Sequence, residues 1–273
     1  MSDAGDGAPF CGRPGLNVAT YDLRARLDGL LFGDHAPFYA ARAREQGGPV
    51  LDLGCGTGRI ARAMAEEAGV AVTGVDRSAA MLDRAEARRA AADPEVAARL
   101  TFREGDMVAP GVTGPFGLVV IPLRGFQEIL DPDDQRRALA AAHARLAPGG
   151  RLVLDLFDPR LEACLPAGDD APLTLPPFPL DDGTTVHVQA RERRNDPFHQ
   201  IMREDWRFTQ YAADGTLLRE EAEVLCLRWT YRREMRYLLE LAGFVPEAEY
   251  GDFDASPPAY GKQQIWVARL STL

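Results

Sequence analysis

The pattern of apolar and polar positions changes character along the chain. From Tyr21 to Gln46, apolar residues recur at helical spacing with breaks at Gly33 and Pro37, which predicts two short helices. From Pro49 onwards, short apolar runs alternate with amphipathic stretches. This alternation is typical of a parallel sheet built from strand–helix–strand units.

Seven strands and four long helices follow from this pattern. The strands are predicted at residues 50–53, 70–75, 100–104, 117–122, 151–157, 244–250 and 264–270. The helices are predicted at residues 59–67, 78–91 with Ser78 as N-cap, 133–146 closed by Pro148-Gly149-Gly150, and 230–242 ending at Gly243. The predicted fold class is α/β, with a seven-stranded, mostly parallel, doubly wound sheet and helices on both faces.

A different pattern interrupts the core after the fifth strand. Residues 159–179 are rich in proline, and residues 184–226 alternate like an antiparallel meander with a hairpin turn at Ala213-Asp214-Gly215. We therefore expect a flexible N-terminus at 1–15, an N-terminal helical lid at 16–48, and a core formed by 49–158 and 227–273. The antiparallel β insertion at 159–226 is expected to cover the substrate.

Charge and composition narrow the class of partner. A formal net charge of −10 and a pI near 5.0 provide no positive field for nucleic acid or anionic membranes. The four cysteines form no C-x-x-C pair, and no ligand spacing indicates a metal. No apolar run approaches the roughly 20 residues of a membrane span. These features predict a cytoplasmic protein, either a monomer or a homodimer, with a small-molecule partner.

Three glycines mark the turn from the first strand into the next helix. Gly54, Gly56 and Gly58 stand at alternate positions where a buried strand turns into a helix, so backbone amides can approach a ligand closely. A dinucleotide fingerprint requires a glycine at position 59, where Arg59 stands. The loop, including Cys55, is better suited to the methionine part and ribose of a nucleoside ligand. Asp52 is expected to organise the loop or to meet the ammonium group of the ligand.

The ends of the second and third strands add polar groups at the same edge of the sheet. Asp76 is expected to accept the ribose hydroxyls, and its alternative function is to cap the next helix. After the third strand, Gly105, Asp106 and Met107 offer an acceptor for an adenine amino group and an apolar surface for the ring. The remaining residues predicted at this site are Arg77 and Met81.

In order and spacing, these three sites resemble the class I S-adenosylmethionine-dependent methyltransferases over residues 50–157. The resemblance implies S-adenosyl-L-methionine as cofactor and S-adenosyl-L-homocysteine as product. Outside this core, the chain resembles small bacterial enzymes that methylate metabolites, including sugar N,N-dimethyltransferases of macrolide biosynthesis. By that resemblance, Tyr21 and Tyr39 close over the methionine end of the cofactor or the reacting amine; alternatively, both rings fill the core.

The end of the fourth strand is expected to line both cofactor and acceptor. Pro122, Leu123 and Gln127 are assigned to the cofactor, and Arg124 either holds an anionic acceptor group or pairs with a carboxylate. Related sugar-modifying enzymes have a histidine base near position 128, where this chain has Glu128. Glu128 is the catalytic candidate, as a base or as a partner for a cationic amine; the alternative is a solvated loop carboxylate.

Two residues of the insertion are candidates for contacts with the acceptor substrate. His199 and Trp206 are the predicted substrate residues, and the alternative for Trp206 is a position in the core. If this strand runs unbroken, His199 and Tyr211 lie on one face and Glu204 and Trp206 on the other.

The predicted function is transfer of a methyl group to a nitrogen or oxygen atom of a small molecule in bacterial secondary metabolism. The alternatives are C-methylation and non-methylating chemistry by a cyclase, lyase or regulatory binding module on the same fold. A nucleic-acid target is disfavoured by the charge and by the segment Ile121-Pro122-Leu123-Arg124, where base-methylating enzymes carry an Asn-Pro-Pro-Tyr-like sequence.

Overall fold

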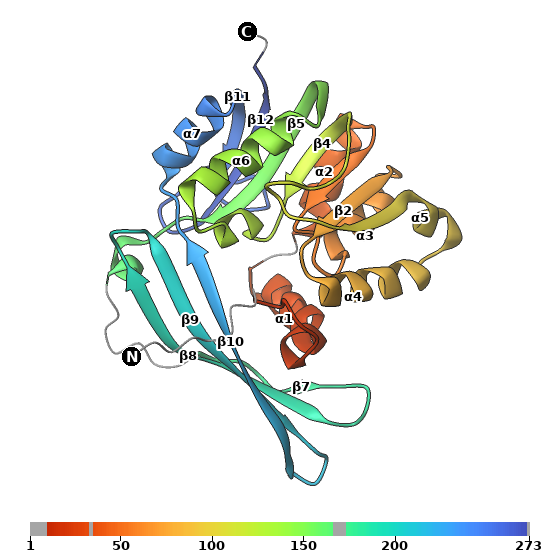
Figure 1. The fold of residues 1–273 in the computed structure, drawn as a ribbon, viewed down its shortest axis with the longest axis vertical. Helices are drawn as coiled ribbons and strands as arrows, with labels where there is room; N and C mark the ends of the chain where they lie inside the picture. Colours follow the sequence, from red (N-terminus) through yellow and green to blue (C-terminus); the bar gives the residue numbers. More distant parts are fainter. Residues whose placement is uncertain (1–9, 33–34, 166–172, 272–273) are drawn as a thin grey trace.

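A central sheet of seven strands organises the protein (Figure 1). The computed structural model describes residues 10–32, 35–165 and 173–271. The strand order is β11-β12-β5-β4-β1-β2-β3; β1 to β5 run parallel, and β12 is antiparallel to both of its neighbours. The bounds are β1 Val50–Leu53, β2 Val72–Asp76, β3 Leu100–Glu104, β4 Phe116–Ile121, β5 Leu146–Phe157, β11 Phe244–Tyr250 and β12 Gln263–Leu270. The predicted fold class is confirmed.

Helices cover both faces of this sheet. One face carries α2 (Ala36–Gln46), α3 (Arg59–Glu67), α4 (Ala79–Ala90) and α5 (Pro94–Arg99), and the other carries α6 (Pro132–His143) and α7 (Arg232–Leu241). Because successive strand residues point to opposite faces, Leu118 packs toward α3 while its neighbour Val119 packs toward α6. The carboxyl ends of the parallel strands are left uncovered by these layers.

Local signals explain where the helices begin and end. Ser78 caps α4 as predicted, since its Oγ accepts the amide of Met81 at 3.2 Å. The predicted continuation of α6 to residue 146 was wrong. The helix ends at His143, and Leu146 instead pairs with Phe116 as the first residue of β5. The short helix α5 was not predicted.

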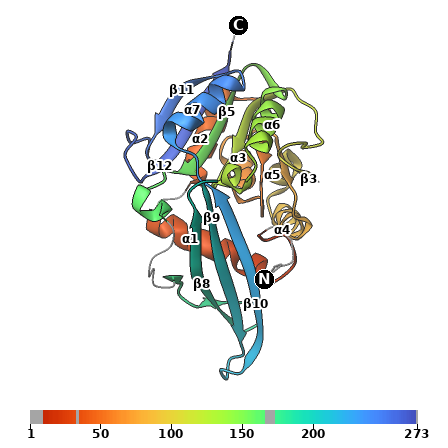
Figure 2. The same ribbon diagram turned by 60° about the vertical axis from the view of Figure 1, so that its left-hand side comes forward.

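The insertion forms a second, antiparallel sheet, as predicted. Its order is β10-β9-β8-β6, and β7 also pairs with β8. The bounds are β6 Leu173–Thr174, β7 Phe178–Pro179, β8 Thr185–Asp196, β9 Ile201–Tyr211 and β10 Leu217–Arg228. Figures 1 and 2 show long strands that extend away from the carboxyl end of the central sheet. The turn at Ala213-Asp214-Gly215 closes with a hydrogen bond from the Gly215 amide to the Ala212 carbonyl.

The two predicted lid helices lie in different places. Helix α1 (Leu16–Phe32) packs on the inserted sheet, with Leu16 and Leu23 against Val186 and Phe208. Helix α2 instead belongs to the core, because its face around Tyr39 is buried against the central sheet. Only α1 therefore occupies the position expected of a lid. None of the described helices is both long and apolar enough to cross a membrane.

The segment Phe10–Gly15 crosses from the insertion to the central domain, and we call it the strap. Its residue Cys11 is 4% exposed, and its amide is bound by Glu223 of β10 at 2.8 Å. Carboxylates of β10 thus accept backbone amides at both ends of the strap, at Cys11 and at the following Leu16, and residues 1–9 lie outside the described residues.

Candidate active site

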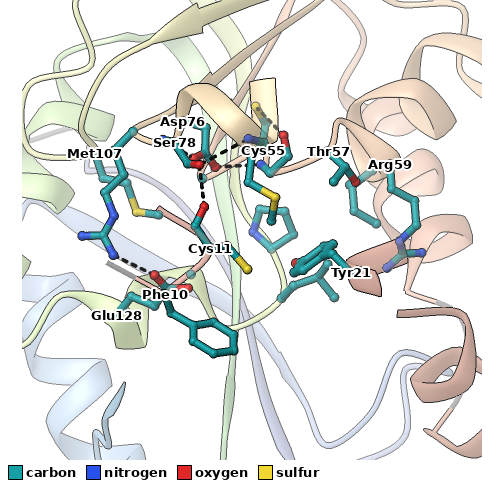
Figure 3. Close-up of a pocket in the computed structure, with 18 of the residues that line it drawn as sticks. Phe10, Cys11, Tyr21, Cys55, Thr57, Arg59, Asp76, Ser78, Met107 and Glu128 are labelled. Carbon is teal, nitrogen blue, oxygen red and sulfur yellow. Dashed lines mark hydrogen bonds and ion pairs between the residues drawn. The ribbon is translucent and has the colours of Figure 1, made fainter. Parts of the chain in front are cut away.

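One cavity gathers most of the predicted cofactor residues at the carboxyl ends of β1, β2 and β4 (Figure 3). The strands end side by side here, so loops distant in sequence meet. The predicted residues that line it are Tyr21, Gly54, Cys55, Gly56, Asp76, Arg77, Met81, Gly105, Asp106, Met107, Pro122, Leu123 and Glu128.

The backbone of the glycine loop adopts a conformation that favours glycine. Gly54 and Gly56 have φ values of 74° and 53°, in the left-handed region that glycine adopts readily. A Cβ at Gly54 would collide with the methyl group of Met107. Gly58 does not line the cavity, contrary to prediction. It precedes α3, and a Cβ there would lie 2.7 Å from the Phe102 ring, so Gly58 serves packing.

Asp76 ties two loops together at the cavity wall. Its Oδ2 accepts the amide of Gly56 at 2.7 Å, and its Oδ1 accepts the amide of Ser78 at 2.8 Å. Burial raises the pKa of Asp76, and the two amides oppose that shift. The carboxylate thus fixes the glycine loop while it lines the cavity, whereas the side chain that caps α4 is Ser78; ribose binding by Asp76 stays a prediction.

Asp52 lies two residues before the glycine loop and does not line the cavity itself. It is fully buried, and neither carboxylate oxygen has a hydrogen-bond partner within the described ranges. Burial and the charge of Asp76 raise its pKa to about 8. A buried carboxyl without a partner beside a glycine cradle fits a ligand that brings a cationic group, such as the methionyl ammonium of S-adenosylmethionine.

The strap contributes two residues of the cavity that the sequence did not reveal. Phe10 and Cys11 close its open side, opposite the glycine loop (Figure 3). The Ser78 hydroxyl donates to the Cys11 carbonyl at 2.6 Å, and burial raises the pKa of the Cys11 thiol to about 12. The other lining residues that were not predicted are Thr57, Arg59, Ile60, Ser78, Gly125 and Ile129.

A second and larger cavity lies between the central sheet and the inserted sheet. It has a volume of about 850 Å³, within the usual size range of small-molecule sites. We call the first cavity the cofactor cavity. The two spaces adjoin, since both are lined by Phe10, Tyr21, Leu123 and Glu128. Arg124 and Trp206, both predicted to contact the acceptor, also line this larger space, which we call the acceptor cavity.

Glu128 stands where the two cavities meet. It ends the short helix η1 (Gly125–Glu128), and Arg77 binds its carboxylate at 2.9 Å. The side chain is about one third exposed. Burial raises the pKa of Glu128, while the Arg77 guanidinium opposes the shift. A carboxylate with a raised pKa at this junction is suited to proton transfer.

The inserted sheet presents a polar cluster to the acceptor cavity. Glu204 accepts the Trp206 indole N–H at 3.1 Å and two hydrogen bonds from the Arg193 guanidinium, at 2.6 and 2.9 Å. Both Glu204 and Trp206 line the cavity, in agreement with the predicted alternation. The donors and acceptors within this cluster satisfy one another, which makes the wall rigid.

Besides Asp52 and Gly58, three predicted site residues lie outside both cavities. Tyr39 is buried in the core, and its hydroxyl donates to Asp155, because α2 turns this face toward the sheet. Gln127 is also buried; its Oε1 accepts the amide of Phe157 at 3.0 Å. His199 lies in the turn between β8 and β9, where its Nδ1 is 2.6 Å from the Asp196 Oδ2. It is not part of β9, because Gln200 adopts a left-handed conformation and the strand begins only at Ile201.

Among the residues that the structure describes, no carboxylate pairs with Arg124. Its guanidinium lies over the Phe157 ring, 5.8 Å from the centroid, at the edge of the acceptor cavity. Of the two functions considered from the sequence, pairing with a neighbouring carboxylate is thus not observed. Over the described ranges, no three His, Cys, Asp or Glu side chains are arranged to hold a metal ion.

Comparison with known proteins agrees with this geometry. The methyltransferase domain family matches residues 50–150. The cypemycin N-terminal methyltransferase of a Streptomyces species is 30% identical over 221 residues, which cover 81% of this chain and 82% of the relative.

Solved structures extend the likeness to the whole fold. An amino pentose methyltransferase from Micromonospora echinaspora, involved in calicheamicin biosynthesis and bound to S-adenosylmethionine, is 25% identical with a TM-score of 0.69, covering 92% of this chain and 97% of its own. A sugar N-methyltransferase from Streptoalloteichus is 24% identical with a TM-score of 0.71, and the match covers 99% of this chain and 97% of that structure. This second likeness shows the fold alone.

These relatives are methyltransferases, and they argue against the non-methylating alternatives. The Gly54 and Gly56 backbone and the Asp76 side chain line a single cavity, and a curated relative matches over most of both chains. The chain therefore belongs to the class I S-adenosylmethionine-dependent methyltransferases.

Proposed function

We propose that this methyltransferase acts on an amine nitrogen of a small molecule in bacterial secondary metabolism. The observation that carries the proposal is the position of Glu128, whose carboxylate lines both the cofactor cavity and the acceptor cavity. A carboxylate there attracts an ammonium group and can accept its proton. A neutral hydroxyl acceptor gains less from this charge.

The names of two relatives support a nitrogen acceptor. One is described as an N-terminal methyltransferase for cypemycin, and another as an amino pentose methyltransferase involved in calicheamicin biosynthesis. Both descriptions name amino compounds, and the second places its enzyme in the biosynthesis of a natural product. Together with the acceptor cavity, they favour a small amine as the acceptor of this chain.

The chain's own residues have three tasks in this reaction. S-adenosylmethionine, when bound, supplies a methyl group on a sulfonium, which an in-line nucleophile can displace. Phe10 and Tyr21 separate the reacting atoms from bulk water. Glu128 takes one proton from the acceptor ammonium and leaves the nitrogen lone pair free to attack. Arg77 holds the Glu128 carboxylate at the junction by their ion pair.

The test is transfer of a labelled methyl group to matched acceptors. The purified protein would be incubated with methyl-labelled S-adenosylmethionine and pairs of small molecules that differ only by an amine or a hydroxyl at one position. We expect label in the amine members and loss of most of that transfer in Glu128→Gln. Transfer to the hydroxyl members alone would overturn the proposal.

A further inference from the structure

The turn after β4 contains two consecutive residues in an unfavourable backbone conformation. Leu123 and Arg124 have φ values of 55° and 64°, in the left-handed region that side chains disfavour. Neither residue is glycine, so the turn costs conformational energy that surrounding contacts must offset. Such strain indicates that the exact course of this turn matters to the site.

A single buried carboxylate provides those contacts. Asp155 of β5 is 2% exposed and accepts the Leu123 amide at 2.7 Å and the Arg124 amide at 3.1 Å, one on each oxygen. The pairing of β4 with β5 places it there, since Ile121 lies opposite Leu154, the residue before Asp155. Hydrogen bonds to an ionised acceptor are stronger than neutral ones. The Tyr39 hydroxyl donates a third hydrogen bond to the same side chain.

The turn carries residues of both cavities. Leu123 lines the cofactor cavity and the acceptor cavity, and Arg124 lines the acceptor cavity. The Arg124 carbonyl then accepts the Gln127 amide at 2.8 Å, which starts η1 and leads to Glu128. A shift of the turn would therefore move the wall between the cavities and the proposed base together.

Asp155 lines neither of these two cavities, but it lines a smaller third cavity next to Leu123 and Arg124. We propose that Asp155 is a positioning residue, which fixes the Leu123–Arg124 turn through its backbone amides and so sets the wall shared by cofactor and acceptor. The effect on the cofactor wall is independent of the proposed function, and only the consequence for Glu128 rests on it.

The test compares two nearly isosteric variants that remove different hydrogen bonds from the same carboxylate. Asp155→Asn replaces one acceptor oxygen with an NH₂ group that faces a backbone N–H, so the turn loses one amide bond. Tyr39→Phe removes only the third bond and leaves both turn amides bound. Each protein would be examined by calorimetric titration with S-adenosylhomocysteine, by thermal unfolding, and by hydrogen exchange at the amides of Leu123 and Arg124.

We expect Asp155→Asn to bind S-adenosylhomocysteine about tenfold more weakly and to exchange both turn amides faster. Tyr39→Phe should keep an affinity within about twofold of wild type, even where its unfolding temperature falls. Unchanged affinity in Asp155→Asn, or an equal loss of affinity in both variants, would overturn the proposal.

If Asp155→Asn does not fold, hydrogen exchange at the same two amides of the wild-type protein tests the proposal. Protected amides at Leu123 and Arg124 would support the proposal, and exchange as fast as in an open loop would overturn it. Because the probe is S-adenosylhomocysteine, the result does not depend on which acceptor atom is methylated.

Discussion

Asp22 on helix α1 accepts a hydrogen bond from the Thr57 hydroxyl of the glycine loop at 2.7 Å. Its other oxygen binds the Arg88 guanidinium of α4 at 2.7 Å. The helix that covers the active site is thereby joined to the loop that cradles the cofactor.

Removing that link should weaken cofactor binding. Asp22→Ala deletes a hydrogen bond and the ion pairs with Arg88 and Arg84, at a position where the side chain is 17% exposed. We expect the affinity for S-adenosylhomocysteine to fall about tenfold, which corresponds to about 1.4 kcal/mol. Asp83→Ala, which removes an exposed carboxylate from α4, is the control and should bind as wild type does. Equal affinities for all three proteins would show that α1 is not coupled to the loop.

Asp76 should be more important for the cofactor than Asp22. The Asp76→Ala variant frees the amides of Gly56 and Ser78 and removes the acceptor expected for the ribose hydroxyls. We predict a loss of affinity of at least about a hundredfold for S-adenosylmethionine and S-adenosylhomocysteine, measured by calorimetry. Binding within tenfold of wild type would contradict the assignment of this carboxylate to the cofactor.

The pH dependence of methyl transfer should report on Glu128. A base is active in its ionised form, and burial raises the pKa of Glu128, so activity should fall with decreasing pH at a point above the usual range of a glutamate. The Arg77 guanidinium lowers this pKa. Arg77→Gln should therefore move the acidic limb of the rate profile to higher pH, by up to about one unit.

Glu128→Gln provides the matching control for this profile. The variant should be slow at every pH, and its rate should lack that acidic limb. An acidic limb that persists in Glu128→Gln would assign the titration to another group and exclude Glu128 as the base.

Asp52 should make the ligand-free protein less stable as the pH rises. Its pKa is about 8 in the folded state against a reference value of 3.8, so between these values the folded state binds a proton that the unfolded chain has released. The contribution to stability is complete below pH 3.8 and decreases up to about pH 8. Relative to Asp52→Asn, which does not titrate, wild type should lose about 2–3 kcal/mol from pH 5 to pH 7. Parallel denaturant titrations of both proteins measure this difference, and identical pH slopes would refute it.

Sequence patterns predicted the parts of the protein that are determined locally. The strands around Val50 and Leu100 and the cap at Ser78 depend on neighbouring residues, and the structure has them as predicted. The glycine loop and Asp76 were recognisable because strand ends converge at one edge of a parallel sheet. These features account for most of the cofactor cavity.

The parts that were missed or misplaced depend on contacts between distant residues. Cys11 lies at the site because Glu223, 212 positions later, accepts its backbone amide, and no local sequence pattern predicts this pair. Tyr39 and Tyr21 are both helical aromatics near the N-terminus, yet only the packing of α2 against Asp155 shows that Tyr39 lies in the core. His199 was misplaced because one left-handed residue, Gln200, ends the strand alternation early.

The position of the strap affects both cavities. Phe10 belongs to the walls of both, and the strap beside it is bound at one side by Ser78 of the central domain and at the other by Glu223 of the insertion. An opening of the strap for cofactor exchange would also remove Phe10 from the wall of the acceptor cavity. The acceptor cavity is complete only while the strap is down, so we expect a compulsory order of turnover, in which the cofactor binds before the acceptor and the methylated product leaves before the spent cofactor.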